Sequence, residues 1–571
     1  MYDLVIRGGT LVDGSGAPAR TGDLAIQDGI IQQAGGSAGP ARRVIDASGC
    51  LVTPGWVDIH THYDGQATWD PYLTPSTWHG VTTAIMGNCG VGFAPVRPQD
   101  RDWLIRVMEG VEDIPGAVLS EGIQWDWESF PQYLDALARR PKALDIGAQV
   151  PHSALRTYVM GERGVHHDEA TPEDIQQMCA LLGEAMRAGA LGFSTSRTFL
   201  HKYEGRKYPP GTFATLAEIG ALGETLGAAG HGVFQMTSNH VSMDGEIPWL
   251  RKLARHNRLP VLFNLQQTDP EPDLWQTLLA ALEDARAQDI PLFGGICGRP
   301  LGLLFSWETS LHPFIQSVAY QRLQALPFAQ RIAALRQPDT RHAILHGERT
   351  LADKNLERMF SQFSRIYPME ARPDYEPAED KSVASLARQS GRDPLEVIYD
   401  LMLEQDGKAI LYYPSFNYSY GELSQIHAML QTPSTVNSLA DGGAHCGYIC
   451  DVSMPTFMLT HWTRDRRRGP RLSVEAMVRR QTLETARLYG LHDRGLLQPG
   501  KKADINVIDY ARLNLHAPRM VYDLPAGGRR LVQDADGYVA TLVAGMPIFE
   551  HGQATGELPG RLLRGAAGGA R

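Results

Sequence analysis

The sequence predicts an α/β fold in which a (β/α)8 barrel of the TIM type fills the middle of the chain and a small β domain is built from both chain termini. Strand-like and helix-like patterns alternate over several hundred residues of the middle, which is typical of parallel strand–helix units. Both ends carry short apolar runs separated by turn residues instead. A doubly wound open sheet in the middle and two independent β pieces at the ends are the alternatives that this pattern leaves open.

Residues 1–53 and 497–560 form the predicted β domain. In the first segment, apolar runs alternate with Asp-Gly pairs such as Asp13-Gly14, and these pairs favour tight hairpin turns. Residues 503–509 repeat the same texture near the other end of the chain. We expect residues 561–571 to form a flexible tail.

Residues 54–496 form the predicted barrel, whose active site would lie at the carboxyl ends of its strands. Its clearest helix starts at Thr171, which precedes Pro172 and two acidic residues, and the apolar pattern of this helix ends at Gly189. The mostly helical stretch at about 302–409 exceeds one strand–helix unit, so we interpret it as an insertion over the barrel mouth or a lid. The predicted strands include residues 82–86, 144–150, 191–194, 232–236, 261–265 and 291–296, and two further helices are predicted at 275–288 and 473–489.

Composition narrows the class of protein and its partners. The 571 residues carry a net charge of −10, and this acidity disfavours nucleic acid and anionic membranes as partners. No apolar stretch approaches the roughly 20 residues that span a bilayer, and the first residues lack the pattern of a signal peptide. We therefore expect a cytoplasmic protein. The six cysteines show no dense spacing and are expected to be reduced thiols.

A candidate metal centre follows two of the predicted strands. His60 and His62 end an apolar run, and side chains two residues apart on a strand point to the same side, so both imidazoles could reach one ion. A bare His-x-His is equally compatible with two core histidines bonded to backbone. Cys89 lies in a Gly-Asn-Cys-Gly turn after the next strand, where the glycines permit a tight turn. A thiolate prefers zinc to magnesium or calcium, although a lone buried cysteine commonly acts as a small apolar residue.

Several stretches resemble the amidohydrolase superfamily, and within it the D-aminoacylase branch, the N-acyl-D-amino-acid deacylases. The resemblance spans nearly the whole chain. It implies a metal-bearing (β/α)8 barrel flanked by a β-sandwich that both termini build. The superfamily stretches are residues 3–14, 54–62, 439–443 and 500–507, and the stretches typical of the branch are residues 86–90, 151–156 and 191–196.

The resemblance also implies roles for individual residues. Asp441 closes the last strand, where the superfamily aspartate contacts the metal and acts as general acid and base. His445 follows it and is a candidate to stabilise an oxyanion or support a ligand, with an ordinary loop histidine as the alternative. A substrate carboxylate needs a cation, for which Arg197 and Arg299 are candidates because both follow barrel strands, although the favoured interpretation of each is an ordinary loop or salt-bridge arginine. The charged run 464–468 is expected to be a solvated loop.

The sequence departs from the family on the predicted fourth, fifth and sixth barrel strands, at residues 191–194, 232–236 and 261–265. No lysine occurs at residues 190–194, where hydantoinase-type members carry the carboxylated lysine that bridges two metals. Gln235 on strand five, and Asn264 or Gln266 on strand six, stand where the branch supplies histidines, and His240 would need a shift of register to replace one. Cys89 could take the bridging role, but the second metal site is doubtful. We expect one zinc ion, bound by His60, His62, Cys89 and Asp441.

The predicted function is metal-dependent hydrolysis of the amide bond of an N-acyl amino acid, by zinc-activated water with Asp441 as general acid and base. A D-amino acid and Nε-acyl-lysine are both candidates, and the choice between D and L is left open. One alternative is a cyclic-amide hydrolase of the hydantoinase or dihydropyrimidinase type, which the missing lysine disfavours. Another is a catalytically silent scaffold of the same fold, which the complete set of four ligands disfavours. A homo-oligomer is left open.

Overall fold

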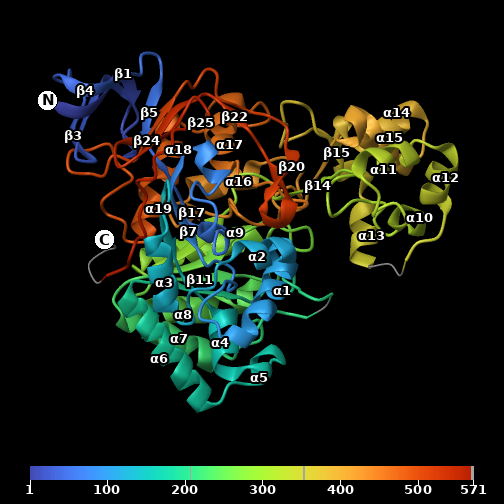
Figure 1. Ribbon diagram of the computed structural model, residues 1–571, viewed down its shortest axis with the longest axis horizontal. Coiled ribbons are helices and arrows are strands. Elements are labelled where there is room, and N and C mark those ends of the chain that lie inside the picture. The colour runs from blue at the N-terminus through green and yellow to red at the C-terminus, as the bar shows by residue number, and fades with distance from the viewer. Residues whose placement is uncertain (206, 351–353, 567–571) are drawn as a thin grey trace.

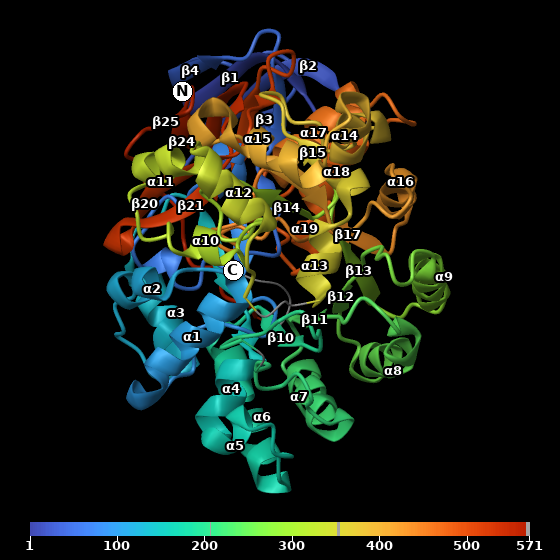
Figure 2. The same cartoon turned by 90° about the vertical axis from the view of Figure 1, so that its right-hand side faces the viewer.

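The computed structural model describes residues 1–205, 207–350 and 354–566 (Figures 1 and 2). Residues from both ends of the chain share one nine-stranded sheet. Strand β1 (Tyr2–Leu11) pairs with β5 (Leu51–Pro54), and β5 pairs in turn with β18 (Ile505–Ile508) from the other end of the chain. The remaining strands of this sheet are β2 (Arg20–Gln27), β3 (Ile30–Ala34), β4 (Ala41–Asp46), β23 (Tyr538–Val543), β24 (Met546–Glu550) and β25 (Gln553–Ala554).

The middle of the chain holds two parallel sheets whose strand order follows the chain, without the reversal of a doubly wound sheet. Only Gln149 separates the last strand of one sheet from the first strand of the other. At their far ends, a parallel bridge joins Thr61 to Gly442. The first sheet consists of β6 (Trp56–Asp58), β7 (Val81–Met86) and β8 (Asp145–Ala148). The second consists of β9 (Val150–Pro151), β10 (Gly192–Ser196), β11 (Val233–Thr237), β12 (Val261–Asn264), β13 (Leu292–Ile296) and β17 (Thr435–Asn437).

Helices connect these strands and pack against them. Helix α6 (Pro172–Ala188) begins after Thr171 as predicted, Thr171 and Asp174 form a capping box, and Gly189 ends the helix with a φ of +105°. The helix predicted at 473–489 is instead two helices, because the backbone leaves the helical region at Thr482. The other helices of this part are α1 (Arg101–Glu112), α2 (Gly116–Gly122), α3 (Phe130–Arg139), α4 (His152–Met160), α5 (Glu162–Val165), α7 (Leu216–Ala228), α8 (Ile247–Asn257), α9 (Leu274–Ala287), α16 (Ser424–Gln431), α17 (Met454–Thr460), α18 (Val474–Gln481) and α19 (Leu483–Leu488).

The insertion forms a lobe of its own, on the right in Figure 1. Its core is a separate apolar cluster around Trp307, Tyr399 and Met402. Strand β14 (Gly302–Phe305) pairs with β16 (Leu411–Pro414), so the lobe extends a few residues beyond the predicted boundary at 409. Its other elements are β15 (Tyr367–Pro368), α10 (Val318–Gln321), α11 (Phe328–Leu335), α12 (Pro338–His346), α13 (Lys354–Phe360), α14 (Val383–Ser390) and α15 (Pro394–Gly407).

Two short hairpins and the C-terminal segment complete the chain. The hairpins pair β19 (Asn514–Leu515) with β22 (Ala535–Asp536) and β20 (Arg519–Leu524) with β21 (Gly528–Val532). Residues 561–566 pack against the parallel strands, so the prediction of a flexible tail from residue 561 is wrong for them: Arg561 N donates to Asp145 and Leu563 is buried. Residues 567–571 of that predicted tail lie outside the described residues. None of the helices in the described part of the chain has the length and apolarity needed to cross a membrane.

Candidate metal centre

The predicted metal ligands come together at the carboxyl ends of neighbouring strands. His60 and His62 follow β6, and Cys89 follows β7. Their ligand atoms lie within 4.8 Å of one another, and all three side chains are buried. Asp441 follows β17 and joins them through the backbone, because Asp441 N donates to His60 O at 3.1 Å and His62 N donates to Gly442 O at 2.7 Å.

The carboxylate of Asp441 faces both imidazoles. Asp441 Oδ1 lies 3.3 Å from His60 Nε2 and 3.7 Å from His62 Nε2, and the residue is only 8% exposed. Its φ of +49° places a non-glycine residue in the left-handed region, which costs energy and is common at functional sites. The structure therefore brings together all four residues that the sequence analysis proposed as ligands.

Cys89 is held in a strained turn. Its φ is +56°, and a Cβ on Gly87 would lie 2.3 Å from Gln149 O, so only glycine fits at Gly87. Cys89 N donates to Gln235 Oε1 at 3.3 Å, and Gly90 N donates to Ser194 Oγ at 3.0 Å. These hydrogen bonds fix the turn that brings Cys89 Sγ within 3.2 Å of His60 Nε2.

The donor set fits a divalent metal ion. Neither ring nitrogen of the buried His62 has a hydrogen-bond partner among the described residues, which is costly unless another species completes the site. Burial lowers the pKa of His60 to about 3, so this imidazole is neutral, as a metal ligand must be. Burial likewise raises the pKa of the Cys89 thiol to about 11, and a nearby cation would favour its thiolate. Two imidazoles, one thiol and one carboxylate are the ligand types that zinc and similar ions prefer.

The ionisable groups of the centre strongly shift one another's pKa values. Burial alone would lower the pKa of His62, but the carboxylates of Glu112 and Asp441 hold it well above its usual value. Burial alone would raise the pKa of Asp441, but its contacts with His62 and His60 hold it well below its usual range. The centre therefore favours a carboxylate at Asp441 and a positive charge beside it.

Glu112 was missed by the sequence analysis. It is the last residue of α1, is 1% exposed, and places Oε1 3.5 Å from His62 Nδ1. Its Oε2 lies 3.6 Å from His445 Nε2, which brings the candidate residue His445 to the edge of the centre. No motif marks Glu112 in the sequence, and only the packing of α1 reveals it.

The amides on β11 and β12 are engaged with the backbone of Cys89 and with each other. Gln235 Oε1 accepts the hydrogen bond from Cys89 N, and Gln235 Nε2 lies 3.5 Å from Asn264 Oδ1. Gln266 is hydrogen-bonded to the side chain of Asn417. His240 packs against Phe416 and is outside the ligand cluster.

A second residue that the sequence analysis missed, His201, lies near the centre. His201 follows β10, and its Nδ1 lies 3.0 Å from Ser196 Oγ. Burial, together with the neighbouring His445 and His62, lowers its pKa to about 3. The only sequence signal was its place in the loop after a predicted strand.

The two candidate substrate arginines do not join this cluster. Arg197 Nε lies 3.0 Å from Glu246 Oε2, and Arg197 also donates to Ala214 O. Arg299 is fully buried, pairs with Asp451 at 2.9 Å and lies against the ring of Tyr375. Both arginines form the internal ion pairs that were the alternative interpretation.

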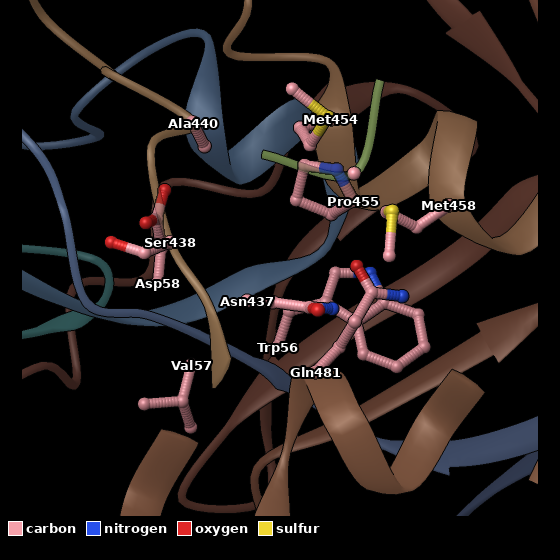
Figure 3. Close-up of a pocket in the computed structure, with 11 residues that line it drawn as sticks. Trp56, Val57, Asp58, Asn437, Ser438, Ala440, Met454, Pro455, Met458 and Gln481 are labelled. Carbon is pink, nitrogen blue, oxygen red and sulfur yellow. The ribbon is translucent and has the colours of Figure 1, made fainter. Parts of the chain in front are cut away.

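A small cavity is lined in part by Asp58 and Ser438, two residues that contact His60 (Figure 3). Asp58, Ser438, Asn437 and Gln481 line it with apolar side chains, and its volume of about 30 Å³ has room for one or two water molecules. Ser438 Oγ lies 3.4 Å from His60 Nδ1, and Asp58 Oδ1 accepts the hydrogen bond from His60 N. This cavity therefore supports the ligand His60 and is too small for an organic substrate.

These features define a protein with a buried cluster of potential metal ligands at the ends of parallel strands, and comparison with known proteins gives its family. The amidohydrolase family matches residues 43–549. The chain therefore belongs to the amidohydrolase family, which hydrolyses carbon–nitrogen bonds in amides.

Three relatives illustrate this membership. A D-aminoacylase of Alcaligenes xylosoxydans xylosoxydans is 28% identical over 98% of this chain and 97% of its own. A solved D-aminoacylase structure, described as having a binuclear metal centre with one-metal activation and second-metal attenuation, has a TM-score of 0.65 and 24% identity over 99% of this chain and 100% of its own. An N-acyl-D-glutamate deacylase structure from Bordetella bronchiseptica, with zinc and a phosphonate inhibitor, has a TM-score of 0.64 and 24% identity over 99% of both chains. The two structures share the fold of this chain.

Proposed function

We propose that this protein is a zinc-dependent hydrolase that cleaves the amide bond of N-acyl amino acids. One observation carries the proposal. His60, His62, Cys89 and Asp441 converge at the ends of parallel strands, and the nitrogens of His62 have no other partner among the described residues. In a chain of the amidohydrolase family, such a set is best explained as a catalytic metal site.

The proposal includes a closed (β/α)8 barrel. The bridge between Thr61 and Gly442 supports closure, since it joins the segment after the first parallel strand to the segment after the last. A closed barrel would bring the carboxyl ends of all its strands to one face, where this fold carries its active sites. It would account for ligands that are 381 residues apart in sequence, at His60 and Asp441.

Zinc is the proposed metal, at one ion per chain. The thiol of Cys89 favours a borderline-soft ion, and the deacylase of Bordetella bronchiseptica binds zinc. Gln235 and Asn264 stand where the D-aminoacylase branch supplies histidines, and their amide groups are engaged with Cys89 N and with each other. A second ion would lack ligands there.

The mechanism assigns separate tasks to Asp441 and His445. When bound, zinc supplies a Lewis acid that makes water acidic near neutral pH. The carboxylate of Asp441 takes the proton of the attacking water and later returns it to the leaving amine. His445, held beside Glu112, donates a hydrogen bond to the carbonyl oxygen as negative charge develops on it.

The proposed substrates are N-acyl-D-amino acids, because the named relatives that cover the whole chain are D-aminoacylases and related deacylases. Nε-acyl-lysine remains a candidate, since neither Arg197 nor Arg299 lies among the metal ligands to select an α-carboxylate. Arg197 is the better placed of the two to meet a substrate, because its side chain is 21% exposed whereas that of Arg299 is 1% exposed.

Metal content tests the proposal. We expect about one zinc ion per chain in the native protein, and its loss in Cys89→Ala. Cys50→Ala is the matched control, because Cys50 is a free thiol in the terminal β domain. A panel of D and L N-acyl amino acids, with Nε-acyl-lysine, then identifies the substrate. Native protein that takes up no metal after reconstitution would contradict the proposal.

A further inference from the structure

We infer that Glu112 is a positioning residue of the metal centre, whose carboxylate orients His62 towards the ion and places His445 beside it. The inference rests on the proposed metal-dependent function. Glu112 ends α1, a helix that carries none of the metal ligands. Its two carboxylate oxygens face the two histidines, with Oε1 3.5 Å from His62 Nδ1 and Oε2 3.6 Å from His445 Nε2.

Fold stability alone does not explain a carboxylate at this position. Glu112 is 1% exposed, and no lysine or arginine of the described residues lies within 4.0 Å of it. Its Oε1 also has no hydrogen bond among those residues. A buried carboxylate that no lysine or arginine accompanies is costly. A divalent ion bound through His62 would place positive charge beside this carboxylate, so metal binding and Glu112 stabilise each other.

The geometry explains how Glu112 prepares His62. The Nε2 atom of His62 faces Asp441 at 3.7 Å, and its Nδ1 faces Glu112. A proton on Nδ1, the nitrogen that faces the carboxylate, leaves the lone pair of Nε2 for the ion. Carboxylate–histidine–metal arrangements of this kind raise the basicity of the ligand, and their removal costs 10- to 100-fold in metal affinity.

The two proposed histidine ligands, His60 and His62, differ in the group that faces Nδ1. The Nδ1 of His60 faces the hydroxyl of Ser438 at 3.4 Å, which is a neutral partner. The Nδ1 of His62 faces the charged Glu112. We therefore expect His62 to be the ligand whose strength depends on a carboxylate, and Ser438→Ala to weaken metal binding less than a change at Glu112.

The end of α1 also anchors the loop that carries His445. Glu112 O accepts the hydrogen bond from His445 N, and the side chain of Asp113 accepts one from Gly447 N at 2.8 Å. These bonds fix His445 next to the Glu112 carboxylate. The carboxylate of Glu112 thus fixes the proposed metal ligand His62 and the proposed oxyanion donor His445 relative to each other.

Glu112→Gln tests the inference, with zinc affinity measured by competition with a chromophoric chelator. We expect the zinc dissociation constant to rise by about 10- to 100-fold, and the absorption spectrum of the cobalt-substituted protein to shift as the His62 ligand changes. Glu109→Gln is the matched control, because Glu109 lies on the same helix and is exposed. This control should keep the affinity and the spectrum of the native protein.

The outcomes separate this inference from the proposed function. Native affinity and an unchanged cobalt spectrum in Glu112→Gln would overturn the role of Glu112, while tight binding by the native chain would leave the proposed function standing. Native protein that binds no metal would overturn the proposed function itself. If Glu112→Gln does not fold, Glu112→Asp decides, because it keeps the charge but shortens its reach. A several-fold loss of affinity in Glu112→Asp supports the inference, and native affinity overturns it.

Discussion

Two buried clusters of charge in this protein differ in how their polar atoms are satisfied. In the first, the metal centre, the ring nitrogens of His62 and one oxygen of Glu112 have no hydrogen-bond partner in the described part of the chain. In the second, the two carboxylate oxygens of Glu376 each accept a hydrogen bond at 3.1 Å from the fork of Arg466. Glu376 also accepts a hydrogen bond from Leu423 N, and His461 lies 3.2 Å from it.

This difference distinguishes the proposed metal-binding cluster from a cluster that stabilises the fold. Both clusters are almost inaccessible to water, so burial does not distinguish them. In the second cluster, both carboxylate oxygens of Glu376 are paired with Arg466, and this pair joins the insertion, which contains Glu376, to the segment around Arg466. In the first cluster, Glu112 Oε1 has no such partner among the described residues. An unpaired buried carboxylate oxygen beside the unpaired ring nitrogens of His62 supports the proposed metal site.

The largest effect is expected from Asp441→Asn. An amide cannot take the proton of water, but its oxygen can still approach a metal ion, so we expect kcat to fall by about 1000-fold while metal content stays near that of the native protein. Steady-state kinetics with the best substrate of the panel and metal analysis check this. Asp406→Asn is the control, because the side chain of Asp406 is 91% exposed. Turnover near the native value in Asp441→Asn would refute the assigned role.

A smaller effect, on stability, is expected from Glu376→Gln. The buried Arg466 would lose its carboxylate, which should cost about 3 kcal/mol in the apparent free energy of unfolding, measured with urea. The exposed pair between Lys381 and Glu370 gives the matched control, and Glu370→Gln should cost less than about 1 kcal/mol. Equal effects of the two substitutions would mean that the buried cluster is no more structural than a surface pair.

The stability of Glu376→Gln relative to the native protein should also depend on pH. Burial would raise the pKa of Glu376, but its contacts with His461 and Arg466 lower it to about 2. Because this pKa lies below the ordinary value of about 4.3, the carboxylate stabilises the fold above pH 4.3, and its contribution is lost as the pH falls towards 2. The stability difference between the native protein and Glu376→Gln should therefore shrink over that interval.

The sequence predicted the features that depend on local pattern. Strands β7, β10, β11, β12 and β13 lie within about two residues of their predicted ranges, because each is a short apolar run between turn residues. The helix after Thr171 begins and ends as its capping residues indicate. His60, His62 and Cys89 were found because they lie next to predicted strands in a recognisable spacing.

Features that depend on contacts distant in sequence were not predictable. The run around Arg466 was expected to be a solvated loop, which is wrong for Arg466, because its partner Glu376 lies 90 residues away in the insertion. Glu112 has no motif, and its role depends on where α1 ends relative to His62. The break at Thr482 follows from its backbone conformation and not from any glycine or proline.

The smallest effect is expected on the number of metal ions bound. It shows whether the amides of Gln235 and Asn264 are what prevents a second ion from binding. Gln235 and Asn264 lie on neighbouring strands with their amide groups 3.5 Å apart, and Gln235 contacts Cys89 N. Imidazoles at both positions would place two nitrogen ligands beside Cys89. We therefore expect the double variant Gln235→His with Asn264→His to take up a second zinc ion per chain at high zinc concentration, more weakly than the first. Each single variant is a control, because one imidazole is too few ligands for a stable site. A double variant that still holds one ion at saturation would mean that the fold, and not these two amides, limits this centre to a single metal.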